Sequence, residues 1–339
     1  MNPDHILEID NMQVTFRTLD GLVRGVDGVS FHVRPGETLG LVGESGCGKS
    51  VTAHSIMRLL PKRTAKISRG AIRFRRRNGD VVDLTTVDPE GSLIRAIRGN
   101  EIAMIFQEPM TSLSPMHTIG EQIIEAITLH QNVSGKDAED RAVEMLEAVR
   151  IGNARQFIRS YPHQYSGGMR QRAMIAMALS CNPSVLIADE PTTALDVTIQ
   201  AQILDLMRRL QDEFESAIIM ITHNLGVINE VADRVAVMYL GKIVEVADRR
   251  TLFKRPAHPY TVGLMQSVPE LGRKDRQRLH PIPGMIPDPF NVPKGCSFHP
   301  RCPVAKPSCS SIDEVPLVEV EPGHFVRCTL YSDGVAGHD

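Results

Sequence analysis

A glycine-rich run near the N-terminus has the residue types and spacing needed to bind phosphate. It reads Gly43-Glu44-Ser45-Gly46-Cys47-Gly48-Lys49-Ser50, followed by Val51, which is the P-loop spacing G-x-x-x-x-G-K-S. Backbone N–H groups of such a loop surround phosphate oxygens, and glycines allow a close approach because they lack a Cβ. We expect Lys49 to reach the β- and γ-phosphates and Ser50 to ligate Mg²⁺. The run therefore predicts a nucleoside triphosphate site.

Two adjacent carboxylates, Asp189 and Glu190, follow the apolar run 185–188. In P-loop enzymes an Asp at the end of a strand holds Mg²⁺, and the next residue is placed to accept a proton from the attacking water. Acidic pairs at strand ends are common, so the pair alone is a weak signal. The P-loop in the same chain favours the catalytic interpretation.

A second phosphate-binding pattern, Ser166-Gly167-Gly168, precedes a helical run from Arg170 to Leu179. A hydroxyl and bare N–H groups at a helix start suit a phosphate, and an ordinary N-cap is the alternative. One chain cannot easily bring both phosphate-binding patterns to the same triphosphate. We therefore expect the second pattern to cap ATP held by another subunit.

Four of the six cysteines fall in the last 44 residues, with the spacing C-x5-C-x6-C-x18-C. They are Cys296, Cys302, Cys309 and Cys328. Structural zinc sites use tighter pairs, whereas four thiolates with a proline after Cys302 suit an iron–sulfur cluster. Zn²⁺ and unligated thiols remain the alternatives.

The elements that must position these residues can be read from the hydrophobic pattern. Alternation over 6–16 and 22–33, with Asp20-Gly21 between, predicts a hairpin, and 70–84 predicts another around Asn78-Gly79. The apolar runs 38–42, 101–106, 185–188 and 217–221 predict buried strands.

Helical spacing of apolar residues dominates between about 118 and 180, and again at 199–214 and 224–232. A hairpin with Gly241 at its turn is predicted over 235–246. Beyond 256 prolines are dense, and a boundary is expected near 255. The sequence thus predicts an α/β domain with an antiparallel β layer, an inserted helical subdomain at about 108–180, and a cysteine-containing extension at 256–339.

Composition narrows the class of protein. The 339 residues are 42% hydrophobic and 23% charged with a net charge of −2, which does not support a protein that coats nucleic acid. No apolar run approaches the roughly 20 residues that span a bilayer. The first residues lack a basic region followed by an apolar core, so we expect a cytoplasmic location.

Taken together, the motifs resemble an ATP-binding cassette (ABC) ATPase subunit over about residues 6–250. The ordered set is the P-loop 43–50, Gln107, the signature 166–168, Asp189-Glu190, Ala194-Leu195-Asp196 and His223. The resemblance implies a RecA-like nucleotide-binding domain that uses ATP and Mg²⁺. It departs from the usual Leu-Ser-Gly-Gly-Gln signature at Tyr165 and Met169.

The resemblance also implies residue roles. Gln107 would link the Mg²⁺ and water site to membrane subunits, Asp196 would lie at a dimer seam, and His223 would contact the γ-phosphate. Phe16 would stack on adenine, with a core aromatic as the alternative.

Three runs are similar to those in ATPase subunits of peptide and nickel importers, most closely the importers of oligopeptides and dipeptides. They are 106–116, 258–261 and Gly295-Cys296-Ser297-Phe298-His299-Pro300-Arg301-Cys302-Pro303. That branch implies a 4Fe–4S cluster at the four cysteines. It also implies a paralogous ATPase partner or a second copy, two membrane permeases and an external binding protein, with this chain at the cytoplasmic face of the membrane. Nickel, an opine or a saccharide is an alternative cargo. A soluble ABC protein acting on nucleic acid is the rival class, and the chain lacks its usual second cassette or coiled coil.

Overall fold

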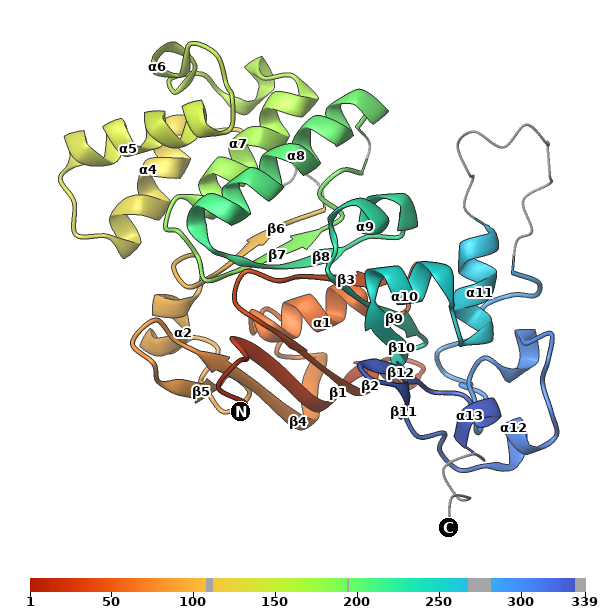
Figure 1. Cartoon of the computed structure of the whole chain (residues 1–339). Helices are drawn as coiled ribbons and strands as arrows, with labels where there is room; N and C mark the ends of the chain where they lie inside the picture. Colours follow the sequence, from red (N-terminus) through yellow and green to blue (C-terminus); the bar gives the residue numbers. More distant parts are fainter. Residues whose placement is uncertain (108–111, 194, 268–281, 333–339) are drawn as a thin grey trace, which may run out of the picture. The chain divides into compact units, whose positions relative to one another are not determined.

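The computed structural model describes residues 1–107, 112–193, 195–267 and 282–332, and these form two compact units (Figure 1). The first unit comprises Met1–Glu8, His32–Thr38 and Arg73–Ile221, and the second comprises Ile9–Phe31, Leu39–Ile72 and Thr222–Asp339. The strand that leads into the P-loop, Thr38–Val42, thus shares the second unit from Leu39 onward with the C-terminal segment.

Buried parallel strands form the sheet of the first unit. Its strands are β6 (Ile102–Ile105), β7 (Val185–Asp189) and β8 (Ala217–Ile221), with β7 between the other two. Every residue of these strands is buried, which explains why all of them except Asp189, at the end of β7, are apolar. The short strand β5 (Val81–Asp83) pairs antiparallel with the end of β4 (Ala65–Arg75), and α2 (Ser92–Ile97) follows.

The helical region of the first unit is confirmed. It contains α4 (Ile119–His130), α5 (Gly135–Ala148), α6 (Ala154–Phe157), the 3₁₀ turn η1 (Pro162–Gln164) and α7 (Gly167–Leu179). Thr118 caps α4 through a capping box with Glu121, and Ser134 caps α5. The predicted helix around 199–214 is α8 (Val197–Phe214).

The second unit is built on a mixed sheet in the order β11-β12-β10-β9-β3. Its strands are β3 (Thr38–Val42), β9 (Arg234–Tyr239), β10 (Lys242–Asp248), β11 (Val318–Glu321) and β12 (His324–Val326). Leu240 and Gly241 turn between β9 and β10 with φ values of 41° and 79°, so the hairpin predicted at Gly241 is confirmed. The long strands β1 (Leu7–Thr18) and β2 (Gly21–Val33) are neighbours in a separate sheet.

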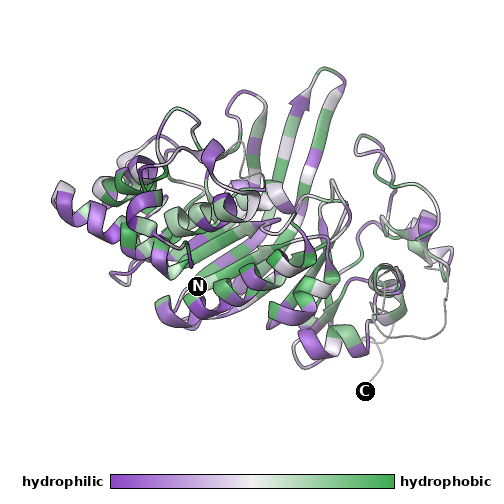
Figure 2. Ribbon diagram, turned by 90° about the horizontal axis from the view of Figure 1, so that it is seen from above, coloured by the Kyte–Doolittle hydropathy of each residue, from purple (hydrophilic) through white to green (hydrophobic). Residues whose placement is uncertain are grey.

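The C-terminal segment has more regular structure than its proline content predicts. It contains α10 (Arg249–Lys254), α11 (Pro259–Gln266), the turn η2 (His299–Arg301), α12 (Ser308–Ser311) and α13 (Thr329–Ser332), while β11 and β12 extend the sheet. The remaining helices of this unit are α1 (Lys49–Ile56) and α9 (Leu225–Val231). Figure 2 shows hydrophobic residues concentrated along the strands. Within the described ranges no helix is both long and apolar enough to cross a bilayer.

Candidate functional site

The P-loop connects β3 to α1 in the second unit, as the sequence predicts. Gly43 and Gly48 have φ values of 152° and 107°, which favour glycine. A Cβ at Gly43 would lie 2.1 Å from the Met238 carbonyl oxygen, and one at Gly48 would lie 2.4 Å from that of Gly25. Ser45 and Gly46 are exposed at the outer side of the loop. The loop backbone is therefore packed tightly where it meets the sheet and open where a phosphate would enter.

Lys49 is the first residue of α1 and is only 7% exposed. Its Nζ donates to the Gly43 carbonyl oxygen at 2.7 Å and to the Glu44 carbonyl oxygen at 3.1 Å. The ammonium group thus lies inside the loop and bonds to the loop's own backbone. Ser50, the next residue, presents its hydroxyl from the first turn of the same helix.

Phe16 lies on β1 and is half-buried. A Cβ at Gly25 would meet the Phe16 ring at 2.7 Å and Val51 Cγ1 at 3.6 Å, so Phe16 packs over Gly25 close to the end of the P-loop. This position suits a ring that stacks on a base, and the core-aromatic alternative is weakened because the side chain is only half-buried.

In the first unit the carboxyl ends of adjacent parallel strands bring Gln107 and Asp189-Glu190 to one edge. Ile105 of β6 is in register with Ala188 of β7, so both motifs leave the sheet at the same level. Gln107 is exposed, whereas Asp189 and Glu190 are buried. Residues 108–111, in the middle of the run 106–116, lie outside the described residues.

Glu190 adopts a left-handed backbone conformation with a φ of 52°, which is rare for a residue other than glycine. Its N–H donates to the Ile221 carbonyl oxygen at 2.8 Å, and its Oε2 accepts a hydrogen bond from Thr193 Oγ1 at 2.7 Å. The carboxylate is therefore held in place by a hydroxyl that sequence reasoning did not identify. Unusual backbone conformations of this kind cluster at functional sites.

Ser166 is the N-cap of α7, and its Oγ accepts a hydrogen bond from the Met169 N–H at 3.3 Å. The ordinary N-cap role is thus present, and Ser166 and Gly167 are also exposed. A pocket beside them is lined by Ser166, Gly168, Met169, Arg150 and Arg172 among others. The start of this helix is thus exposed to solvent.

Two further candidates lie next to helix starts. Asp196 is exposed, and its Oδ1 accepts from the Ile199 N–H at 2.9 Å as the N-cap of α8. His223 is exposed and precedes Asn224, the N-cap of α9. Ala194, which precedes Asp196 in the motif, lies outside the described residues.

Comparison with known proteins agrees with this geometry. Residues 26–193 match the family model described as ABC transporter, and residues 244–309 match the model described as oligopeptide/dipeptide transporter, C-terminal region. A putative peptide import ATP-binding protein of Brucella abortus is 50% identical, over 98% of this chain and 99% of the relative. The chain belongs to the ATP-binding subunits of the oligopeptide/dipeptide ABC transporters.

Two other matches extend over much of the chain. The oligopeptide transport ATP-binding protein AppD of Bacillus subtilis is 50% identical over 97% of each chain. Among solved structures, a dimeric ATP-binding cassette in a post-hydrolysis state with ADP and Pi matches with a TM-score of 0.63 and 26% identity, over 72% of this chain and 99% of that one. The ABC nucleotide-binding fold and the ABC ATPase class are thereby confirmed, and membership of the family implies membrane permease partners.

The departure from the usual ABC signature at Tyr165 has a structural explanation. Its ring is buried and contacts Phe157 edge to face at a centroid distance of 5.7 Å, while its hydroxyl donates to the Phe157 carbonyl oxygen at 2.8 Å. Burial raises the pKa of Tyr165 to about 12. Tyr165 therefore anchors the segment before the helix and leaves the backbone from Ser166 to Gly168 accessible.

The four cysteines of this transporter subunit line one small pocket together with His258, Phe298 and Thr329 among others. Cys309 Sγ lies 3.4 Å from the Lys306 N–H that donates to it and 3.2 Å from Thr329 Oγ1. Burial raises the pKa of Cys296, Cys302 and Cys328, the last to about 11. Across the described ranges no group of three or more His, Cys, Asp or Glu residues is arranged to hold a metal ion.

Two residues in the runs quoted for the peptide importers contact the P-loop directly, a role that sequence reasoning did not assign to them. Tyr260 and Arg301, both in the C-terminal segment, are bonded to Glu44. The sequence contains no local signal for these contacts, because the partners are more than 200 residues apart along the chain.

Proposed function

We propose that this chain hydrolyses ATP to power the uptake of oligopeptides or dipeptides through partner membrane subunits. The observation that carries ATP use is the P-loop that holds Lys49 against its own carbonyl groups, in a chain that also presents Asp189-Glu190 at the end of a buried strand. Peptide cargo is supported by the match over 244–309 and by the names of the relatives. The functional division is an ATPase module at 1–255 and an importer-type extension at 256–339.

The nucleotide roles follow from the chemistry of each side chain. Loop residues 43–51 and Lys49 bind the phosphates, Phe16 stacks on the base, and His223 contacts the γ-phosphate. The oxygen donors of Ser50, Asp189 and Gln107 suit Mg²⁺, which prefers such ligands and would neutralise charge on the phosphates. Glu190 accepts a proton from the attacking water, and Thr193 orients its carboxylate.

A complete site requires a second ATPase subunit. The exposed Ser166 and Gly167, with Gly168, would cap a triphosphate held by the partner's P-loop, and Asp196 would lie at the seam between the two subunits. The partner is a paralogue or a second copy of this chain. The pair would sit at the cytoplasmic face of the membrane, below two permeases that receive cargo from an external binding protein.

The cysteine pocket is proposed to hold a 4Fe–4S cluster, with Zn²⁺ as the alternative. Four cysteines around one pocket match the number of thiolates that such a cluster takes, and the N–H···S contact of Lys306 with Cys309 is of the kind that stabilises a cluster thiolate.

Anaerobic purification tests the cluster. We expect a brown protein with absorbance near 400 nm, about four iron atoms per chain, and loss of both when Cys302 is changed to serine. Cys181→Ser is the matched control, since Cys181 lies outside the pocket, and it should keep the colour. A colourless protein with one zinc per chain would contradict the cluster and support Zn²⁺.

Reconstituted transport tests the function as a whole. In vesicles that contain this chain, its membrane subunits and the binding protein, we expect ATP-dependent uptake of a labelled peptide, which Lys49→Ala abolishes. Uptake of nickel, an opine or a saccharide without peptide uptake would contradict the peptide cargo. Purification with ribosomes or DNA in place of membrane subunits would contradict import.

A further inference from the structure

Glu44, the second residue of the P-loop, is bonded through both its backbone and its side chain to the C-terminal segment. Its N–H donates to the Tyr260 hydroxyl oxygen at 2.8 Å. Its carboxylate accepts from Arg301 Nη1 at 2.7 Å and from Nη2 at 3.0 Å, which is a bidentate ion pair. One loop residue is thus fixed at several atoms by residues that belong to none of the ATP-binding motifs.

Arg301 is itself held rigidly. It is 6% exposed, and its Nε donates to the Pro283 carbonyl oxygen at 3.1 Å. Its guanidinium lies 5.9 Å from the ring centroid of Tyr239 and 6.0 Å from that of Phe298. A charge in such surroundings is costly without its partner, so the pair allows Glu44 few other side-chain positions.

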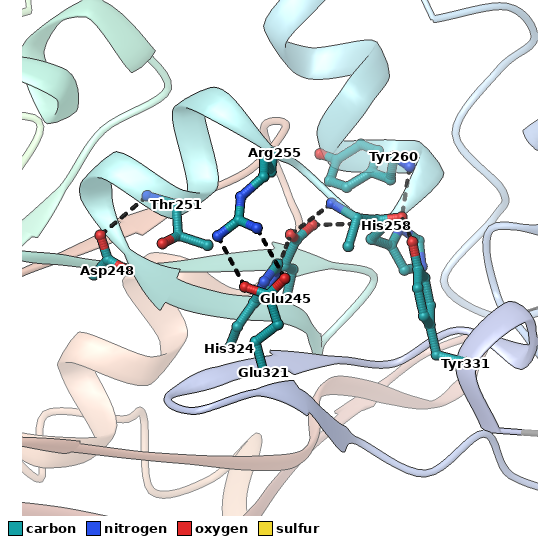
Figure 3. Close-up of polar contacts among 10 residues, drawn as sticks. Glu245, Asp248, Thr251, Arg255, His258, Tyr260, Glu321, His324 and Tyr331 are labelled. Atoms are coloured by element: carbon teal, nitrogen blue, oxygen red, sulfur yellow. Dashed lines mark hydrogen bonds and ion pairs between the residues drawn. The ribbon is translucent and has the colours of Figure 1, made fainter. Parts of the chain in front are cut away.

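Tyr260 is fully buried and contacts the rings of Tyr239 and Phe298 at centroid distances of 4.6 and 5.4 Å. It lies in the first turn of α11, whose N-cap is His258. The backbone N–H groups of Ala257 and His258 donate to the buried carboxylate of Glu245, as Figure 3 shows. The Tyr260 hydroxyl therefore has a fixed position relative to β10.

The same stretch of the loop binds Lys49, because Nζ donates to the carbonyl oxygens of Gly43 and Glu44. The position of Glu44 thus decides where the loop carbonyls and the lysine lie when a phosphate arrives. We propose that Arg301 and Tyr260 are positioning residues that hold the P-loop in the conformation that binds ATP. This inference rests on the proposed ATPase function and adds to it a role for the C-terminal segment.

Titration calorimetry of the full chain with Mg²⁺ and the non-hydrolysable analogue AMP-PNP tests the proposal. If Arg301→Met leaves the loop in its binding conformation only about a tenth of the time, the dissociation constant rises about tenfold. Tyr260→Phe keeps the ring contacts and loses one hydrogen bond, so we expect a rise of about threefold. In ATP hydrolysis assays both variants should raise KM and leave kcat nearly unchanged, because neither residue touches the reacting atoms.

Arg255→Met is the matched control. Arg255 also forms a bidentate ion pair, with Glu321 at 2.9 Å for each bond, but this pair is exposed and does not touch the loop. Its loss should leave the dissociation constant unchanged. Arg301→Lys, which keeps the charge, should recover part of the affinity.

The Glu44→Gln and Arg301→Met double variant should bind no more weakly than Arg301→Met alone, since both changes remove the same ion pair. If the Arg301→Met and Tyr260→Phe proteins fold and bind the analogue with normal affinity, this inference is wrong, while the proposed function is unaffected. If Arg301→Met does not fold, normal affinity of Tyr260→Phe is sufficient to overturn the inference. Absence of binding by the unsubstituted chain would overturn the proposed function and this inference together.

Discussion

Replacing Glu190 with glutamine is expected to lower ATP turnover by roughly 10²- to 10⁴-fold, the usual contribution of a general base. The amide keeps the size and shape of the side chain but cannot accept the proton of the attacking water. Binding of ATP should survive, because the loop 43–50 is untouched. Phosphate release measures the rate, and size-exclusion chromatography with ATP and Mg²⁺ should show an accumulated dimer.

The matched control is Glu101→Gln, the same chemical change at another buried carboxylate of the first unit. Glu101 is 3% exposed and pairs with Arg76 at 2.6 Å. Its replacement should cost stability but leave kcat close to that of the unsubstituted protein. Hydrolysis at the normal rate by Glu190→Gln would show that another group activates the water.

Glu245→Ala is expected to lower the free energy of unfolding by about 3–5 kcal/mol, because three buried hydrogen-bond donors would lose their acceptor at a cost of about 1–3 kcal/mol each. Glu245 is fully buried on β10. Its carboxylate accepts from the N–H groups of Ala257 and His258 at 2.8 and 2.9 Å and from His324 Nε2 at 2.8 Å. All these donors lose their acceptor together, away from water (Figure 3). Urea denaturation followed by circular dichroism measures the change.

Glu321→Ala serves as the control for this prediction. Glu321 also loses a bidentate contact, with Arg255, but both side chains are exposed, so the expected cost is about 0–1 kcal/mol. Similar small effects of the two alanine variants would contradict a structural role for the buried Glu245 network. Because this network holds the start of α11, Glu245→Ala should also weaken ATP binding through Tyr260.

The sequence alone was enough to predict the motifs and strands that are defined by residues close to one another along the chain. The loop 43–50 could be recognised because its function needs glycines, a lysine and a hydroxyl at fixed spacing between a strand and a helix. The buried strands β7 and β8 could be predicted because both faces of a parallel strand are covered, which favours a run of apolar residues such as 185–188 and 217–221. Asp189 and Glu190 followed from the end of β7.

Tertiary structure alone decided what lies against these local elements. The contacts of Glu44 with Tyr260 and Arg301, the convergence of four cysteines on one pocket, and the addition of β11 and β12 to the sheet all join distant segments. Such pairs leave no periodic pattern, because each partner is selected by shape and charge after the chain has folded. The residues that hold the P-loop in place could therefore be identified only from the tertiary structure, whereas the loop itself could be predicted from the spacing of its residues.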